Sequence, residues 1–362
     1  MPDRGHAIQS LREAWRAGNL TLYLGAGVSV GNGLPTWERL VLATYFSAIK
    51  REHLGGWRPY PNYLYAIAEW HLERGNEPLD ITARKIRRYL KKPQDFLQSL
   101  RQTLYAGFLD PDEYESARFK PLEPGALRAA NSTLDAVARL CETRRCNGRG
   151  VKSVISYNYD CLLETVLHPL PVQPIWKPLP FAPKKLPVYH VHGYVPIGDE
   201  PGSTAEEIVF TEEQYHQVAQ DAYSWSNLAQ IQCMSSSVGL MVGLSLSDRN
   251  IRRLLDAVNK TPVPTQNYAF LQEPRWKQPA PEELDRINEK AITYMERFER
   301  SGVKRGGVKG PTWQSQIMGI LEQLEQLGRD EQTFVLEQLG IRPVWYREHG
   351  EIPDIVSEII GS

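Results

Sequence analysis

A glycine-rich loop between two ordered segments constrains the fold of this chain most strongly. Residues 21–24 (TLYL) are apolar and typical of a short buried strand, and residues 36–50 have the pattern of a helix. The loop between them contains four glycines, whose ordering costs more backbone entropy than that of any other residue: Gly25, Gly27, Gly31 and Gly33. Such a loop serves a tight turn, a phosphate cradle or a nucleotide site, and a nucleotide site requires this strand-loop-helix context.

The same order of strand, loop and helix recurs after residue 150. Apolar segments with strand character lie at 151–156, 187–195, 206–210, 238–246, 267–272 and 341–348. Helical patterns separate most of them, and the longest runs over 211–234. The alternation predicts an α/β fold, a doubly wound (Rossmann-like) parallel sheet. Ligands of such sheets bind at the carboxyl ends of the strands, where we expect the polar loops to converge: 25–35, 157–160, 192–194 and 245–250.

Residues 51–149 have a different character, with several helical patterns and few strand signals. They predict a helical insertion or subdomain, so that residues 1–50 and 150–362 form the α/β domain. The run RKIRRYLKK at 84–92 is the strongest basic cluster of the chain. A solvated helix face is the favoured interpretation, and a docking surface for nucleic acid or a protein partner is the alternative.

Charge and cysteine content exclude several classes of function. The formal net charge of -1 creates no field that recruits nucleic acid or an acidic membrane. The sequence has no apolar run long enough to span a membrane and no apolar secretion signal at its start, and its four cysteines fit a reducing compartment, so we expect a cytoplasmic protein. Cys141 and Cys146 lack the spacing of a zinc framework, and no metal is expected.

Four short motifs, taken in order, resemble the signature of the sirtuin family. GAGVSVGNGLP (25–35) is similar to its glycine loop, SYNYD (156–160) to its Asn-x-Asp strand end, HVHG (190–193) to its His-Gly pair and GLSL (243–246) to its Gly-x-Ser segment. The resemblance implies a domain that binds NAD+, with Asn158 and His192 as catalytic residues. It extends over the sheet-forming parts of residues 1–260 and leaves the helical insertion uncovered.

Two departures from the family pattern separate this chain from the protein-deacylating sirtuins. Those enzymes carry a four-cysteine zinc module, which this sequence lacks, and continue the glycine loop as Pro-Asp-Phe-Arg where this chain has Pro35-Thr36-Trp37-Glu38. The residues of the other motifs resemble those of the sirtuin-like effectors of bacterial antiphage defence. That resemblance implies hydrolysis of NAD+, a homo-oligomer, and a partner such as a HerA-type ATPase or helicase, or a short argonaute.

The chemistry of these residue types agrees with that implication. An asparagine such as Asn158 both donates and accepts hydrogen bonds, so it can position a water or a ribose hydroxyl. His192 titrates near neutral pH and can act as a general base. Backbone N–H groups of residues 25–29 can approach the diphosphate. The residues expected to contact NAD+ come from the same motifs: Gly25, Ala26, Gly27, Ser29, Pro35, Asp160, Gly243, Ser245, Asp248 and Asn250.

Several of these residues have a structural alternative. Asp160, Asp248 and Asn250 are equally suited to capping the helix that follows each of them. His190 shares a face with His192 if the strand is regular, and is assigned to packing or support. Trp37 is assigned to the core. For the whole chain, an NAD-dependent deacylase and a non-catalytic nucleotide-binding scaffold subunit of a defence complex remain the alternatives.

Overall fold

The computed structural model describes residues 4–53, 61–74, 78–110, 118–142, 150–180, 182–261, 266–274, 280–300 and 313–361. The chain divides into two compact units. Unit 1 contains residues 1–271 and 338–362, and unit 2 contains residues 272–337. The helices of 51–149 therefore belong to the same unit as the sheet, because three of them pack directly on the helix that follows the glycine loop. The second compact unit consists of residues 272–337, whereas the sequence analysis assigned these residues to the α/β domain.

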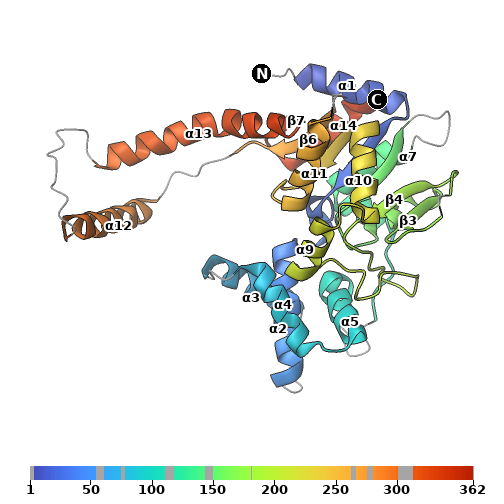
Figure 1. Ribbon diagram of the computed structural model, residues 1–362, viewed down its shortest axis with the longest axis horizontal. Helices are drawn as coiled ribbons and strands as arrows, with labels where there is room; N and C mark the ends of the chain where they lie inside the picture. Colours follow the sequence, from blue (N-terminus) through green and yellow to red (C-terminus); the bar gives the residue numbers. More distant parts are fainter. Residues whose placement is uncertain are drawn as a thin grey trace. The chain divides into compact units, whose positions relative to one another are not determined.

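A seven-stranded sheet forms the centre of unit 1, in the order β3-β4-β2-β1-β5-β6-β7 (Figure 1). Its strands are β1 (Leu20–Leu24), β2 (Val151–Ser156), β3 (Val172–Ile175), β4 (Leu186–His190), β5 (Val238–Val242), β6 (Asn267–Gln272) and β7 (Ile341–Tyr346). The pairings of β1 with β2 and β5, of β4 with β2 and β3, and of β5 with β6 are all parallel. The predicted doubly wound α/β fold is confirmed.

The strand order places a topological switch point between β1 and β5. From β1 the chain adds β2 and β4 on one side, then returns and adds β5, β6 and β7 on the other. Without the extra edge strand β3, this is the order of dinucleotide-binding sheets, which bind their ligand where the winding reverses. All residues of β1 are buried, as expected of a central strand covered on both faces.

Helices cover the sheet and extend unit 1 beyond it. In the first half they are α1 (Arg4–Arg16), α2 (Trp37–His53), α3 (Pro61–Arg74), α4 (Leu79–Tyr89), α5 (Pro93–Leu104), α6 (Pro124–Ala130), α7 (Ser132–Glu142) and α8 (Leu162–Leu167). Later come α9 (Glu212–Gln220), α10 (Trp225–Ser236), α11 (Arg249–Asn259) and α14 (Ile352–Ile360). Helices α1, α7 and α14 pack together, α10 packs on α11, and α3, α4 and α5 pack on α2. Unit 2 contains α12 (Pro281–Arg300) and most of α13 (Trp313–Gln338).

Three local predictions were wrong. Residues 206–210 form no strand, β3 was not foreseen, and the helix predicted over 211–234 is two helices. Helix α9 begins with a capping box of Thr211 and Gln214, and α10 begins with Ser224 accepting from the Asn227 N–H. These two start signals explain the break, because each N-cap stabilises its own helix.

The basic cluster at 84–92 is partly neutralised within the fold. Arg84 on α4 lies 3.3 Å from a carboxylate oxygen of Glu212 and 3.4 Å from one of Glu213, and Arg87 lies 3.7 Å from Glu213. These ion pairs join α4 to the first turn of α9. They show that two of the arginines have partners within the fold, while the solvated helix face and the docking surface both stay predictions. Within the described residues no helix is long and apolar enough to cross a membrane.

Candidate functional site

Two glycine loops meet at the switch point, one after β1 and one after β5. The Gly25 N–H donates to the Val242 carbonyl and the Gly27 N–H to the Gly243 carbonyl, each at 3.0 Å. A Cβ on Gly27 would lie 2.7 Å from Gly243 Cα, and one on Gly25 would lie 2.5 Å from the Gly243 carbonyl oxygen. Gly243 has φ +68°, and a Cβ there would lie 2.6 Å from the Val28 nitrogen. The glycines are thus needed because two backbones touch.

We call this contact of Gly25 and Gly27 with Gly243 the glycine crossing. It changes the expected role of the first loop. The N–H groups of Gly25 and Gly27 donate to carbonyls at the end of β5. Those of Val28 and Ser29 donate to the carbonyls of Gly25 and Ala26 and close tight turns. Four of the five backbone donors in residues 25–29 are therefore engaged inside the protein. The diphosphate contact predicted for this stretch has at most the Ala26 N–H available.

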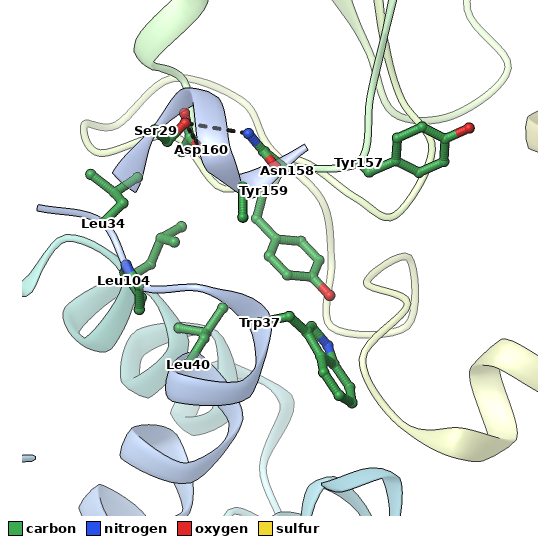
Figure 2. A pocket seen from close by; sticks show the side chains of 11 residues that line it. Ser29, Leu34, Trp37, Leu40, Leu104, Tyr157, Asn158, Tyr159 and Asp160 are labelled. Atoms are coloured by element: carbon green, nitrogen blue, oxygen red, sulfur yellow. Dashed lines mark hydrogen bonds between the residues drawn. The ribbon is translucent and has the colours of Figure 1, made fainter. Parts of the chain in front are cut away.

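A pocket opens beside the crossing and encloses about 360 Å³, counting the part open to solvent. Figure 2 shows polar side chains on one side of it and apolar ones on the other. The pocket is lined by Ala26, Ser29, Leu34, Pro35, Trp37, Leu40, Leu104, Tyr157, Asn158, Tyr159 and Asp160. Five of the predicted residues therefore meet here: Ala26, Ser29, Pro35, Asn158 and Asp160.

A directed chain of hydrogen bonds crosses the polar side of the pocket (Figure 2). The Asn158 amide Nδ2 donates to the Gly25 carbonyl at 3.0 Å and lies 3.3 Å from Ser29 Oγ. Ser29 in turn donates to Asp160 Oδ2 at 2.9 Å. A carbonyl can only accept, so the amide nitrogen must face Gly25 and the Asn158 oxygen must face away. Within the described residues that oxygen accepts no hydrogen bond, which leaves it free for a ligand.

Asp160 is a buried acceptor at the end of this chain. Its second oxygen, Oδ1, accepts the Leu162 N–H at 3.0 Å at the start of α8, so the predicted helix-start role is present. Burial raises the pKa of the Asp160 carboxyl, and the bonds from Leu162 and Ser29 act against that rise. Both oxygens face donors, and Asp160 thus fixes the Ser29 hydroxyl that supports Asn158.

His192 lies directly after β4 but outside the lining of the pocket. It is 6% exposed and packs edge-on against the rings of Tyr157, at 5.4 Å between centroids, and Tyr215, at 5.3 Å. Burial lowers the pKa of His192, while the Asp248 carboxylate and the Tyr157 carbonyl oppose that shift. The imidazole is therefore neutral near pH 7, the state in which a histidine can accept a proton.

The loop after β5 contributes mostly structure. Asp248 caps α11, since its Oδ1 accepts the N–H groups of Asn250 at 2.7 Å and Ile251 at 3.0 Å. The Asn250 side chain is buried and joins Asn227 of α10 to Arg253. Ser245 is exposed and pairs with Ser247 at 2.7 Å. None of Gly243, Ser245, Asp248 and Asn250 lines the pocket described above, so a contact of these residues with NAD+ stays a prediction.

The apolar side of the pocket was harder to foresee. Trp37, assigned to the core, packs against the hydrophobic core and also lines the pocket, beside Tyr159. Leu104 comes from the end of α5, inside the segment that no motif covers. Only tertiary packing of α5 on α2 brings it here. An apolar residue at a helix end carries no local signal for such a role.

Within the described parts of the chain, no group of three or more His, Cys, Asp and Glu side chains could hold a metal ion. Cys141 is buried, while Cys146 lies outside the described residues.

Comparison with protein families identifies the fold that carries this site. Residues 152–295 match the family model described as SIR2-like domain. This segment of the chain is therefore similar to a SIR2-like domain, and the similarity points to activity involving NAD. The match includes Asn158, Asp160, His192 and the loop after β5, whereas residues 25–35 precede it. No curated protein matches the chain.

Proposed function

We propose that this SIR2-like chain is an NAD+ glycohydrolase, which cleaves the nicotinamide–ribose bond to give nicotinamide and ADP-ribose. Water adds to the anomeric carbon, the bond to the nicotinamide nitrogen breaks, nicotinamide leaves as a neutral base, and one proton is released. The observation that carries the proposal is the Asn158 amide oxygen, which two hydrogen bonds of the amide nitrogen orient and which accepts no hydrogen bond from the described residues.

The pocket has the place in the sheet that a dinucleotide site requires. It lies at the carboxyl ends of β1 and β2 next to the switch point, where doubly wound sheets bind such ligands. Apolar Leu34, Leu40 and Leu104 offer a surface for a flat base.

Asn158 is the residue best placed to direct the attack on the anomeric carbon. Its free oxygen can accept a hydrogen bond from water or from a ribose hydroxyl. This bond orients the water, or the ribose, relative to the anomeric carbon. Ser29 and Asp160 hold the amide in that orientation.

His192 is assigned the proton transfer. Its neutral state suits a general base, and it packs against Tyr157, the residue that precedes Asn158 in the loop after β2. Because it does not line the pocket itself, we assign it to accept the proton from water or from a ribose hydroxyl once a ligand has entered and closed the distance.

In the cell we propose that this activity depletes NAD+ during antiphage defence and is gated. An ungated enzyme of this kind would kill its host. The support is the resemblance of the motifs to defence effectors, and it extends to a homo-oligomer and a partner such as a HerA-type ATPase or a short argonaute. The partner would release the activity on infection.

The test is loss of NAD+ and release of nicotinamide by the purified protein, alone and with its neighbour-encoded partner. We expect N158A and H192A each to lower the rate by about 100-fold or more. H216A is the matched control, because His216 is a histidine with a 63% exposed side chain away from the pocket.

Other outcomes would replace the proposal. Nicotinamide release that depends strictly on an acetylated peptide would identify a deacylase. Binding of NAD+ without turnover in both conditions would identify a nucleotide-binding scaffold. Equal rates for wild type, N158A and H192A would remove these residues from the reaction.

A further inference from the structure

A buried histidine that the proposed reaction does not use lies behind Asn158. His190 is the last residue of β4 and is 1% exposed. Its Nδ1 lies 3.0 Å from the Asn158 backbone carbonyl oxygen, and its Nε2 lies 2.7 Å from Glu164 Oε1 on α8. The ring thus joins β4, α8 and the loop that presents Asn158.

The two partners determine the protonation of this ring. A carbonyl oxygen accepts only, so Nδ1 must carry a hydrogen to bond with Asn158. Burial lowers the pKa of His190, but the Glu164 carboxylate and its hydrogen bond raise it overall, so Nε2 carries a second hydrogen and donates it to Glu164 Oε1. The geometry is that of an imidazolium–carboxylate pair inside the protein, where charge-assisted hydrogen bonds are strongest.

Asn158 is consequently held at its side chain and at both ends of its backbone. Its N–H donates to Ser156 Oγ at 3.2 Å and its carbonyl accepts from His190. Its side-chain nitrogen is fixed by Gly25 and Ser29. Only the side-chain oxygen remains for a ligand, so a small rotation of this backbone would misdirect the one atom that matters.

We propose that His190, as an imidazolium paired with Glu164, is a positioning residue that fixes the backbone of Asn158 and thereby aims its side-chain oxygen into the pocket. This inference rests on the proposed function for its catalytic consequence. The hydrogen-bond arrangement itself does not depend on it.

Loss of the imidazolium proton has a predictable consequence. A neutral His190 has one hydrogen, and the Glu164 carboxylate competes for it more strongly than the Asn158 carbonyl. Nδ1 then presents a lone pair to that carbonyl, which keeps the longer 3.4 Å bond from Ser156 Oγ, so the Asn158 backbone is held less firmly. The charged and titratable groups that face His190 are Glu164 from α8, Asp160 from the loop and Tyr194, whose ring lies 4.5 Å away between centroids.

Glu164→Gln separates positioning from charge. The glutamine amide can donate to a bare Nε2, which keeps the hydrogen on Nδ1 and the bond to Asn158. We expect wild-type kcat to fall on the alkaline side as His190 deprotonates, and E164Q to lose that alkaline decline while kcat at pH 7 stays within about three-fold.

His190→Gln should lower kcat at least ten-fold with KM changed less than three-fold. The double variant H190Q/E164Q, which leaves no unpaired buried charge, should show the same loss of kcat if H190Q alone fails to fold.

A second measurement distinguishes failure of this inference from failure of the proposed function. In ¹⁵N-labelled wild-type protein, long-range ¹H–¹⁵N correlation spectra should show both His190 ring nitrogens protonated at pH 7, and the Asn158 side-chain amide should exchange faster in H190Q/E164Q. If the protein never consumes NAD+ but these spectra hold, only the glycohydrolase is refuted. A neutral His190 with a bare Nδ1, or an alkaline limb unchanged in E164Q, overturns the positioning role.

Discussion

Replacement of Gly243 by alanine tests whether the glycine crossing holds the site together. Gly243 and Gly33 both have positive φ, +68° and +81°, so alanine pays a similar backbone penalty at each, about 1–2 kcal/mol. The two positions differ in the space available for a Cβ atom. A Cβ on Gly33 meets nothing within 4 Å, whereas one on Gly243 would lie 2.6 Å from the Val28 nitrogen and 2.9 Å from Gly27 Cα.

The contacts at Gly243 are backbone atoms, which cannot rotate away as a side chain can. Overpacking of this kind costs about 1–3 kcal/mol. We therefore expect G33A to lower the free energy of unfolding by about 1–2 kcal/mol and G243A to lower it by about 2–5 kcal/mol when both terms act.

Urea unfolding followed by tryptophan fluorescence measures both variants beside wild type, with the m-value as a check that the same surface unfolds. The difference between the two variants in the free energy of unfolding measures the steric clash at residue 243, because both variants share the penalty of positive φ. If G243A is no less stable than G33A, the two backbones do not meet as described. G243A should also weaken NAD+ binding, while G33A, whose Cβ meets open space, should retain it.

Two further variants test individual contacts. Asp160→Asn leaves one acceptor for two donors, Ser29 and Leu162, and should cost about 1–3 kcal/mol. Because burial raises the pKa of Asp160 in the folded protein, wild-type stability should fall as pH rises from the usual carboxyl pKa through the folded value. The advantage of wild type over D160N in Tm should therefore be larger at pH 4 than at pH 7, and the opposite trend would contradict the buried carboxyl. Thr211→Ala removes the capping box of α9 and should cost about 1 kcal/mol in urea unfolding, whereas an unchanged midpoint would show that tertiary packing alone holds α9.

Where an element depends on local pattern, the sequence predicted it well. The apolar strand at 20–24, the glycine loop and the following helix occur as expected, and Asn158, Ser29 and Asp160 meet at one pocket. Strand ends converge in any parallel sheet, so residues placed after strands could be brought together without knowledge of their contacts.

The errors arose where distant contacts decide the structure. Residues 206–210 have the composition of a strand, yet the Val209 N–H donates to the His192 carbonyl and the Val209 carbonyl accepts the Tyr159 hydroxyl. These two bonds satisfy the backbone without a neighbouring strand. Composition alone could not reveal them, because both partners lie in other loops.

The two histidines of HVHG illustrate the same limit. A regular strand would place His190 and His192 on one face, but β4 ends at His190. His190 then contacts Glu164 and Asn158, while His192 lies between Tyr157 and Tyr215. Their spacing in the sequence predicted a shared environment, and the end of the strand gives them separate ones.

The glycine crossing also has a consequence for biosynthesis. The wall beside Asn158 is complete only when the loop after β5 bonds to Gly25 and Gly27, and the ribosome produces that loop long after the first one. Segments fold from the N-terminal end as they emerge, but this contact must wait for its partner. A chain released before Gly243 cannot form the site. Unfinished or truncated copies therefore lack the completed wall beside Asn158.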